Sequence, residues 1–309
     1  MILQHRHKRS DLVAVDDSQA SQRAVSYAVS KAHRDEWPLV FVHVFETADH
    51  RDERDANPPS INAALQSAAN GGVSADALIL HGKPRQEIIA AALDMDPRFI
   101  FVGTSGLTGL DRWLLGSVAA DVVRHSDTPV IVVPPVAYPP TEGEPLFSRM
   151  LVPIDPEAKE TSPVSSAIAL AAGTQRHIVF CAVVDEDHLL RVAAQVDGGW
   201  ALGGLIADAR SGAQRTIDAA VARARANEVT AEGFVGSGEP VDTICKLADQ
   251  KSATAIVMGT HGRQGVSRIF LGSTTQGVLA ASRVPVVTFR LGHGLLEVAQ
   301  PIGVVRRER

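Results

Sequence analysis

One string of glycines and small residues occurs twice in this chain of 309 residues, and it constrains the fold more than any other feature. Residues Ile256–Gly262 have the sequence IVMGTHG, followed after nine residues by Gly272 and a serine. Residues Ile100–Gly106 have the sequence IFVGTSG, followed after nine residues by Gly116 and a serine. Two copies with one internal spacing predict two similar structural units.

Short apolar runs alternate with helix-like segments along the first half of the chain. Runs such as residues 39–45 are almost continuously apolar and β-branched, which is typical of parallel strands buried on both faces. Strands alternating with helices predict an α/β fold, with a doubly wound parallel sheet covered by helices on both faces. The expected strands are 11–15, 39–45, 77–80, 99–102 and 129–133, and the expected helices are 18–34, 61–70, 84–93 and 117–125.

The second half repeats this pattern after a proline-rich stretch, which predicts an extended linker. Phe180 repeats Phe41 at an offset of 139 residues, whereas Gly259 repeats Gly103 at an offset of 156, so 17 further residues lie between the second and third strands of the second unit. They predict a long helix over residues 204–227, with a glycine-rich loop before it at Gly198–Gly204. The predicted domains are residues 10–136 and 149–291, with a linker at 137–148 and a C-terminal tail at 292–309.

The composition indicates a globular protein without a global basic field. The net charge is −5 and the pI about 6.1, so we expect neither nucleic acid nor an anionic membrane as a partner. The apolar runs are too short to span a bilayer, and the basic N-terminus lacks the apolar stretch of a signal peptide. Cys181 and Cys245 lack the spacing of a zinc site or a disulfide scaffold, which suggests a reducing cytoplasm.

The carboxyl ends of the strands carry the residues from which we predict a ligand site. Ligands of open parallel sheets bind at these ends, where Asp155 and the turn from Gly259 lie in the second unit. The Asp155 carboxylate could accept ribose hydroxyls, or it could simply cap the following helix. Glycines let backbone approach a ligand, and the helix starting at Gly272-Ser273 offers N–H groups to a phosphate. The alternative is that these glycines only serve tight turns.

This combination of a strand-terminal Asp with G-x-x-G, nine residues and G-[ST] resembles the nucleotide-binding branch of the universal stress protein family, in a tandem-domain form. The resemblance implies two Rossmann-like five-stranded sheets of strand order 3-2-1-4-5, paired about a pseudo-twofold axis through their fifth strands. It also implies bound ATP, with adenine near the second strand, ribose at the Asp and phosphates on the glycine motif. The implied second-unit residues are Pro153, Asp155, Val183, Met258, Gly259, Gly262, Gly272 and Ser273, and the first-unit residues are Ala14, Asp16, Val44, Val102, Gly103, Gly106, Gly116 and Ser117. Two features depart from the family pattern. In the first unit Ser105 stands where the second unit has His261, and in the second unit a proline, Pro156, directly follows Asp155.

Enzymatic hypotheses find less support in the sequence. There is no G-x-x-x-x-G-K-[ST] motif of a P-loop enzyme, and the first strands do not lead into the G-x-G-x-x-G of a dinucleotide dehydrogenase. We therefore predict a cytoplasmic ATP-binding stress-response regulator with slow or absent hydrolysis, whose domains pair within the chain and whose chains form homodimers. The alternatives are a weak Mg²⁺-dependent ATPase or phosphotransferase, with His261 as acid or base, and an interaction module with empty pockets.

Overall fold

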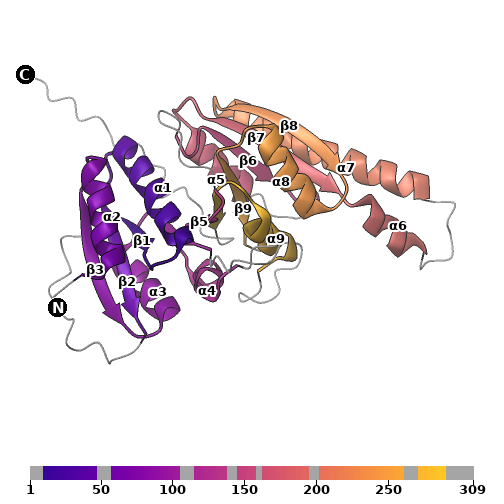
Figure 1. Ribbon diagram of the computed structural model, residues 1–309. Coiled ribbons are helices and arrows are strands. Elements are labelled where there is room, and N and C mark those ends of the chain that lie inside the picture. The colour runs from indigo at the N-terminus through magenta and orange to yellow at the C-terminus, as the bar shows by residue number, and fades with distance from the viewer. Residues whose placement is uncertain are drawn as a thin grey trace, which may run out of the picture.

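The computed structural model describes residues 10–46, 57–104, 115–137, 145–157, 162–194, 202–260 and 271–289. Within these ranges, strands and helices alternate in both halves of the chain, as predicted (Figure 1). The strands are β1 (Asp11–Ala14), β2 (Leu39–Phe45), β3 (Ala75–His81), β4 (Ile100–Gly103), β5 (Val130–Val133), β6 (Arg149–Pro153), β7 (His177–Val184), β8 (Thr230–Ser237), β9 (Ala255–Gly259) and β10 (Val286–Phe289). The helices are α1 (Gln19–Asp35), α2 (Pro59–Asn70), α3 (Pro84–Met95), α4 (Ser117–His125), α5 (Ser162–Ala171), α6 (Glu186–Ala194), α7 (Leu202–Ala226), α8 (Pro240–Gln250) and α9 (Ser273–Ala281).

The described strands form one ten-stranded sheet in the order β3-β2-β1-β4-β5-β10-β9-β6-β7-β8. Pairing within each half is parallel, so each half has the order 3-2-1-4-5, and this confirms the predicted topology. The order reverses beside β1 and β6, where the connections leave in opposite directions. In such sheets this reversal opens a crevice at the carboxyl ends of the strands.

The two halves join through their fifth strands, as predicted. β5 and β10 pair antiparallel, with Val286 opposite Val132 and Thr288 opposite Val130. The Thr288 hydroxyl lies 3.4 Å from the Val130 carbonyl oxygen. The pairing therefore gives the backbone groups at the outer edge of each half a hydrogen-bonding partner within the same chain. An unpaired apolar edge strand would favour aggregation.

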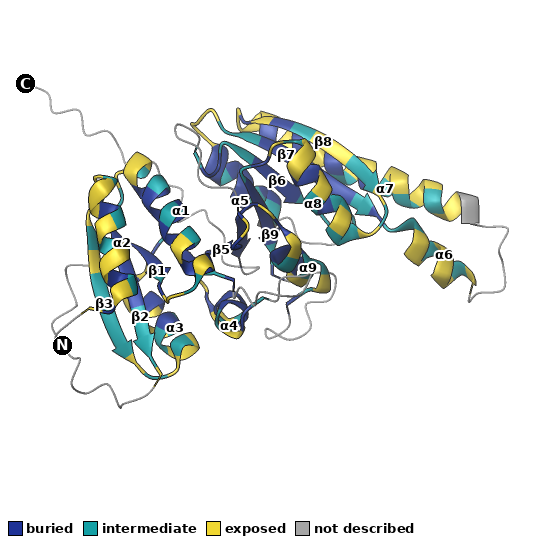
Figure 2. Cartoon of the chain, viewed as in Figure 1, coloured by how far each residue is buried: buried dark blue, intermediate teal, exposed yellow. Residues whose placement is uncertain are grey.

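Two apolar layers cover the sheet (Figure 2). Alternation of side chains along a strand sends neighbours to opposite faces, so Phe41 packs toward α1 and α2 while Val40 packs toward α3 and α4. The second half repeats this, with Phe180 on the side of α5 and α7 and Val179 on the side of α8 and α9. Each apolar layer is continuous across both halves.

The connection between β7 and β8 differs from the prediction in two ways. It contains α6 in addition to the expected long helix, and α7 begins at Leu202, so Gly203 and Gly204 lie in that helix instead of the predicted loop. The rest of that predicted loop lies outside the described residues.

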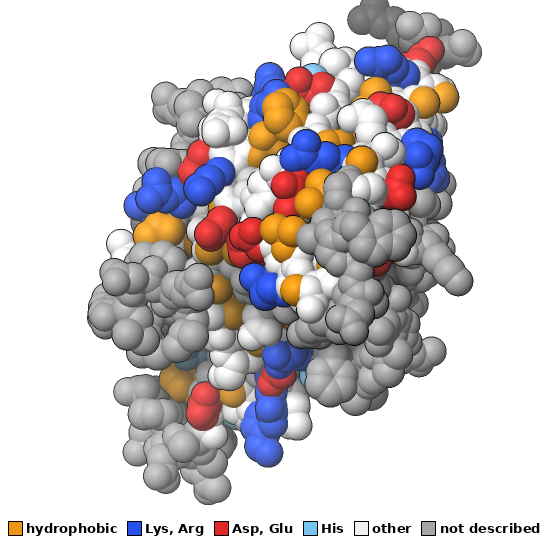
Figure 3. All heavy atoms as spheres, turned by 90° about the vertical axis from the view of Figure 1, so that its right-hand side faces the viewer, with side chains coloured by type: hydrophobic (Ala, Val, Ile, Leu, Met, Phe, Trp, Pro, Cys, Tyr) orange, Lys and Arg blue, Asp and Glu red, His pale blue; other side chains and the backbone are white. Residues whose placement is uncertain are grey.

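On the face shown in Figure 3, cationic and anionic side chains alternate with apolar ones. Exposed apolar side chains of α6 and α7 include Leu190, Val192 and Leu205.

Part of the predicted linker is packed into the core. Phe147 is buried, and its ring centroid lies 5.8 Å from that of Phe99 in the first half. The guanidinium of Arg176, which precedes β7, lies 5.6 Å from the Phe147 ring centroid and donates to the Leu170 carbonyl. Aromatic packing here therefore ties the second half to the first.

A buried charge cluster lies at the amino end of β1, opposite to the crevice. The Lys31 ammonium lies 2.7 Å from Asp11 Oδ2 and 3.0 Å from Asp35 Oδ2. Burial opposes ionisation of Asp35, but Lys31, Arg98 and Arg176 outweigh it and hold the pKa of that carboxyl below its usual range. Because Arg176 belongs to the second half, the cluster also links the two halves electrostatically.

Candidate nucleotide site

Neither strand-terminal aspartate directly precedes a helical residue in the described part of the chain. Ser18 caps α1, because its hydroxyl accepts from the Ser21 N–H. Asp16 lies outside that cap, is exposed, and accepts the Ser18 N–H at 2.9 Å. Asp155 accepts the Glu157 N–H at 3.0 Å in a turn, and the described part of α5 is Ser162–Ala171. Both carboxylates therefore stand at the crevice in the same local turn.

Backbone groups of the second strand of each half face the crevice. The Val42 carbonyl accepts the Val15 N–H at 2.8 Å, so residue 42 points its polar groups toward β1. Every second residue of a strand repeats this direction, so the backbone of Val44 points the same way, past the end of β1. In the second half the Cys181 carbonyl accepts the Ile154 N–H, which places the backbone of Val183 past the end of β6. The backbone groups of Val44 and Val183 are therefore placed to form hydrogen bonds with the polar edge of a ligand in the crevice.

Apolar residues predicted to line a base lie beside these backbone groups. Val102 and Met258 are buried in the layer that α3, α4, α8 and α9 share. Ala14, Val44 and Val183 are partly buried and pack against that same layer. Pro153 ends β6 and is half-buried. The predicted apolar residues therefore converge on one face of the sheet at its carboxyl edge.

Gly103 meets a steric need of the fold itself. A β-carbon added there would lie 2.5 Å from the Ala20 carbonyl carbon and 2.6 Å from the Ser21 nitrogen. The first turn of α1 thus passes directly over Gly103, and only a residue without a side chain allows this approach. Whatever it contributes to a ligand, this glycine is required for packing.

The helices after β4 and β9 begin without a side-chain cap. Gly116 and Gly272 are their N-cap residues, and no side chain accepts a hydrogen bond from the first turn. Gly272 donates its N–H to the Thr260 carbonyl at 3.0 Å, and the Thr275 hydroxyl donates to the Gly259 carbonyl at 3.0 Å. The second-half glycine turn and helix start are thus held together. Uncapped N–H groups and the helix dipole there favour an anion.

Thr104 adds a polar group that the sequence did not single out. It is only 1% exposed, and its hydroxyl has no hydrogen-bond partner within the described part of the chain. Its N–H continues the ladder to the Val133 carbonyl. Val102 faces the α4 side and Gly103 faces α1, so alternation directs the Thr104 hydroxyl toward the α4 side. A buried hydroxyl without a partner is costly, and an anion at the α4 start would satisfy it.

Most of the predicted site residues can be located. Ser117 and Ser273 are exposed first residues of α4 and α9. Gly106, Gly262, Ser105 and His261 lie outside the described residues.

The described residues contain no group of three His, Cys, Asp or Glu side chains placed to hold a metal ion. No helix in the described ranges is long and apolar enough to cross a membrane.

A family model matches the chain over both halves. The model of the universal stress protein family matches residues 11–134 and 146–290. The chain belongs to the universal stress protein family. A Mycobacterium tuberculosis universal stress protein is 27% identical over 92% of this chain and 98% of its own. The family therefore accounts for both halves, in tandem.

Solved structures of universal stress proteins agree with the fold. One from Archaeoglobus fulgidus superposes with a TM-score of 0.61 at 20% identity, covering 92% of this chain and 96% of its own. A universal stress protein in complex with cAMP is 26% identical over 41% of this chain and 98% of its own, with a TM-score of 0.33. The first similarity extends over both halves and supports the tandem arrangement of two α/β units.

Proposed function

We propose that this universal stress protein binds an adenine nucleotide at the carboxyl edge of each half and acts as an ATP-dependent stress-response regulator with slow or absent hydrolysis. One observation carries the proposal. Each half combines an uncapped helix start, at Gly116 or Gly272, with second-strand backbone groups facing the same edge, at Val44 or Val183. The uncapped helix start provides N–H groups for a phosphate, and the strand backbone provides hydrogen-bonding groups for the polar edge of a base.

The remaining residues fit the parts of such a ligand. Asp16 and Asp155 offer carboxylates to ribose hydroxyls, since each follows the first strand of its half at the carboxyl edge. Val102 and Met258 offer an apolar wall to the base. The unsatisfied Thr104 hydroxyl offers a donor to phosphate in the first half. In this proposal Gly106, Gly262, Ser117 and Ser273 complete the phosphate sites.

We further infer a cytoplasmic location. Cys181 and Cys245 are free thiols, and burial raises their pKa values to about 12 and about 11. Unreactive, unpaired thiols suit a reducing compartment. Association of two chains into a homodimer is part of the same proposal.

The proposal is tested by counting nucleotides. Mass spectrometry of protein purified without added ligand should detect an adenine nucleotide, and titration calorimetry with ATP should give two sites per chain. Gly272→Val places β-branched bulk at the helix start, so it should leave one site and a cooperative unfolding transition. If no nucleotide copurifies and millimolar ATP produces no thermal shift, the proposal is wrong.

A further inference from the structure

The two halves differ in charge where their third helices begin, and this difference lies at the nucleotide edge. α3 and α8 follow the third strand of each half, so both start at the carboxyl edge of the sheet. Gly82 and Gly238 correspond at the offset of 156, which aligns Lys83 with Glu239 and Arg85 with Val241. The start of α3 therefore carries two cations beside one acidic residue, Glu87, whereas the start of α8 carries Glu239 and Asp242 and no cation.

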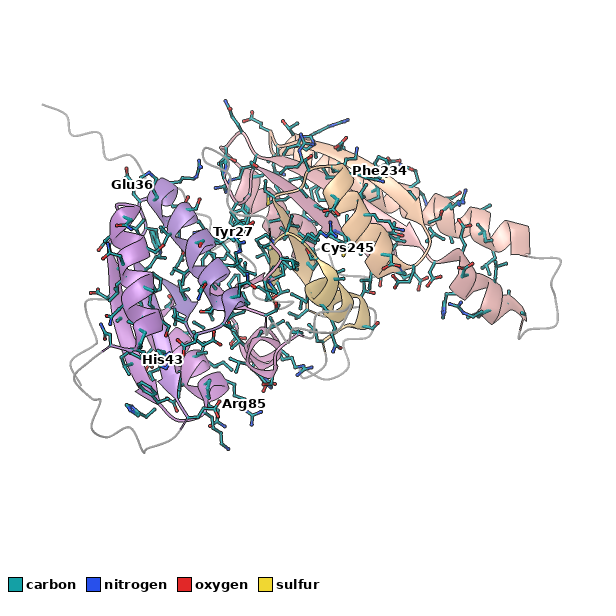
Figure 4. The ribbon with its side chains drawn as sticks, viewed as in Figure 1. Tyr27, Glu36, His43, Arg85, Phe234 and Cys245 are labelled. Carbon is teal, nitrogen blue, oxygen red and sulfur yellow. The ribbon has the colours of Figure 1, made fainter. Side chains whose placement is uncertain are left out.

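Arg85 reaches the helix that begins the first phosphate site. Figure 4 labels Arg85, which lies in α3. Its Nη1 donates to Asp121 Oδ2 of α4 at 2.9 Å. Asp121 stands four residues after Ser117, so its backbone lies about 6 Å of helix rise from the start of α4, on the second turn. This hydrogen bond outweighs burial and holds the pKa of Asp121 below its usual range.

The second half replaces this ion pair by an apolar contact. Val241 aligns with Arg85, and Gly277 aligns with Asp121. A β-carbon added to Gly277 would lie 2.5 Å from a methyl group of Val241, so these two residues pack closely. Both members of the pair change together, and α9 carries no charged residue. Within the described part of the second half, the position aligned with Arg85 therefore carries no cation.

A purely structural role explains Arg85 poorly. Its side chain is 51% exposed, and exposed ion pairs contribute little to stability because water and salt screen them. A guanidinium carries five N–H donors in a planar fork that matches phosphate oxygens. The unsatisfied Thr104 hydroxyl, on the α4 side of the sheet, independently indicates an anion at this place.

We propose that Arg85 is a phosphate-binding residue of the first site and makes that site selective for the more highly phosphorylated adenine nucleotides. On binding, the guanidinium exchanges its contact with Asp121 for the outer phosphates, while the N–H groups at the start of α4 and the Thr104 hydroxyl hold the inner one. AMP does not reach Arg85. The proposal rests on nucleotide binding at the first site and goes beyond it by assigning a residue and a preference.

The test uses full-length Gly272→Val protein, in which the second site is disabled, and calorimetric titration with ATP and with AMP. Arg85→Val, which introduces the second-half residue, should weaken ATP binding about tenfold and change AMP binding less than twofold. Asp121→Asn removes the competing carboxylate and should strengthen ATP binding about threefold. Arg124→Ala is the matched control, because Arg124 Nη1 lies 3.4 Å from the same carboxylate but near the far end of α4. It should leave both affinities unchanged.

The signs of the two main effects separate a ligand role from a structural one. A structural ion pair would make Arg85→Val and Asp121→Asn act in the same direction and on ATP and AMP alike, and that result would overturn the proposal. Unchanged ATP affinity in Arg85→Val would overturn it as well. If the Gly272→Val parent and the wild-type protein bind neither nucleotide, nucleotide binding itself is wrong. Urea midpoints of all variants check that each protein folds.

Discussion

The ammonium of Lys31 lies 2.7 Å from a carboxylate oxygen of Asp11, and both side chains are at most 5% exposed. The other Asp11 oxygen accepts the Phe99 N–H, so one carboxylate joins α1 to the start of β4. Asp11→Ala removes one of the two carboxylates beside the buried Lys31 ammonium, together with the acceptor of the Phe99 N–H, while Asp35 stays paired with Lys31. Asp11→Ala should therefore lower the free energy of unfolding by about 3 kcal/mol in urea titrations.

The matched control for this variant is an exposed ion pair elsewhere in the chain. Arg210 Nε donates to Glu186 Oε1 at 2.9 Å between α7 and α6, and the Arg210 side chain is 56% exposed. Glu186→Ala should cost less than about 1 kcal/mol. Equal losses in the two variants would show that burial does not determine the importance of the Asp11 pair.

The same cluster predicts a pH dependence in acid. The folded-state pKa of Asp35 is lowered, so this carboxyl binds a proton more readily in the unfolded chain than in the folded one. Its contribution to stability is complete above about pH 4 and is lost as the pH falls through the lowered value. Urea midpoints from pH 7 to pH 3 should fall, and Asp35→Asn should flatten the fall below about pH 4. An identical slope in wild type and variant would contradict this assignment.

Two glycine-to-alanine substitutions should change stability in opposite directions. Gly103→Ala places a β-carbon against backbone of Ala20 and Ser21, so we expect a loss of about 1–3 kcal/mol as α1 is displaced. Gly204 lies in α7 with no atom within 4 Å of an added β-carbon. Gly204→Ala should therefore add up to about 1 kcal/mol through helix propensity. A stable Gly103→Ala protein in chemical denaturation would refute the steric role.

The Thr104 hydroxyl should have opposite effects on the ligand-free and ligand-bound protein. Thr104→Val removes a buried hydroxyl without a partner among the described residues, so the ligand-free protein should keep or gain stability. The thermal shift produced by ATP should shrink, because a phosphate donor is lost. Ser166→Ala is the control, since Ser166 in α5 carries another buried, unsatisfied hydroxyl and belongs to the second half. Its ATP-induced shift should equal that of wild type.

Much of the fold follows from sequence because the signals are local. Apolar β-branched runs mark strands, so the predicted limits of β2 agree with the structure. The prediction was wrong for part of the connection after β7. Gly203 and Gly204 suggested a loop, whereas both lie in helix α7. A glycine within a helix lowers its stability by only about 1 kcal/mol relative to alanine. The contacts of the long, alanine-rich α7 with β7 and β8 outweigh this loss.

The site shows where sequence reasoning stops. Spacing identified the glycine turns and the two aspartates, but only the structure shows that Ser18 caps α1 while Asp16 accepts the Ser18 N–H. Thr104 and Arg85 carry no motif, because their importance depends on alternation in β4 and on a contact between residues 36 positions apart. The close approach of α1 to Gly103 is likewise a tertiary fact.

The antiparallel contact of β5 and β10 has a consequence for how such a protein behaves in a cell. Both strands belong to one polypeptide, so dilution cannot separate the halves as it separates two subunits, and the local concentration of each half around the other is fixed by the chain. Every molecule therefore carries one half with cations and one half without cations at the start of the helix after its third strand, in a constant one-to-one ratio, at any level of expression.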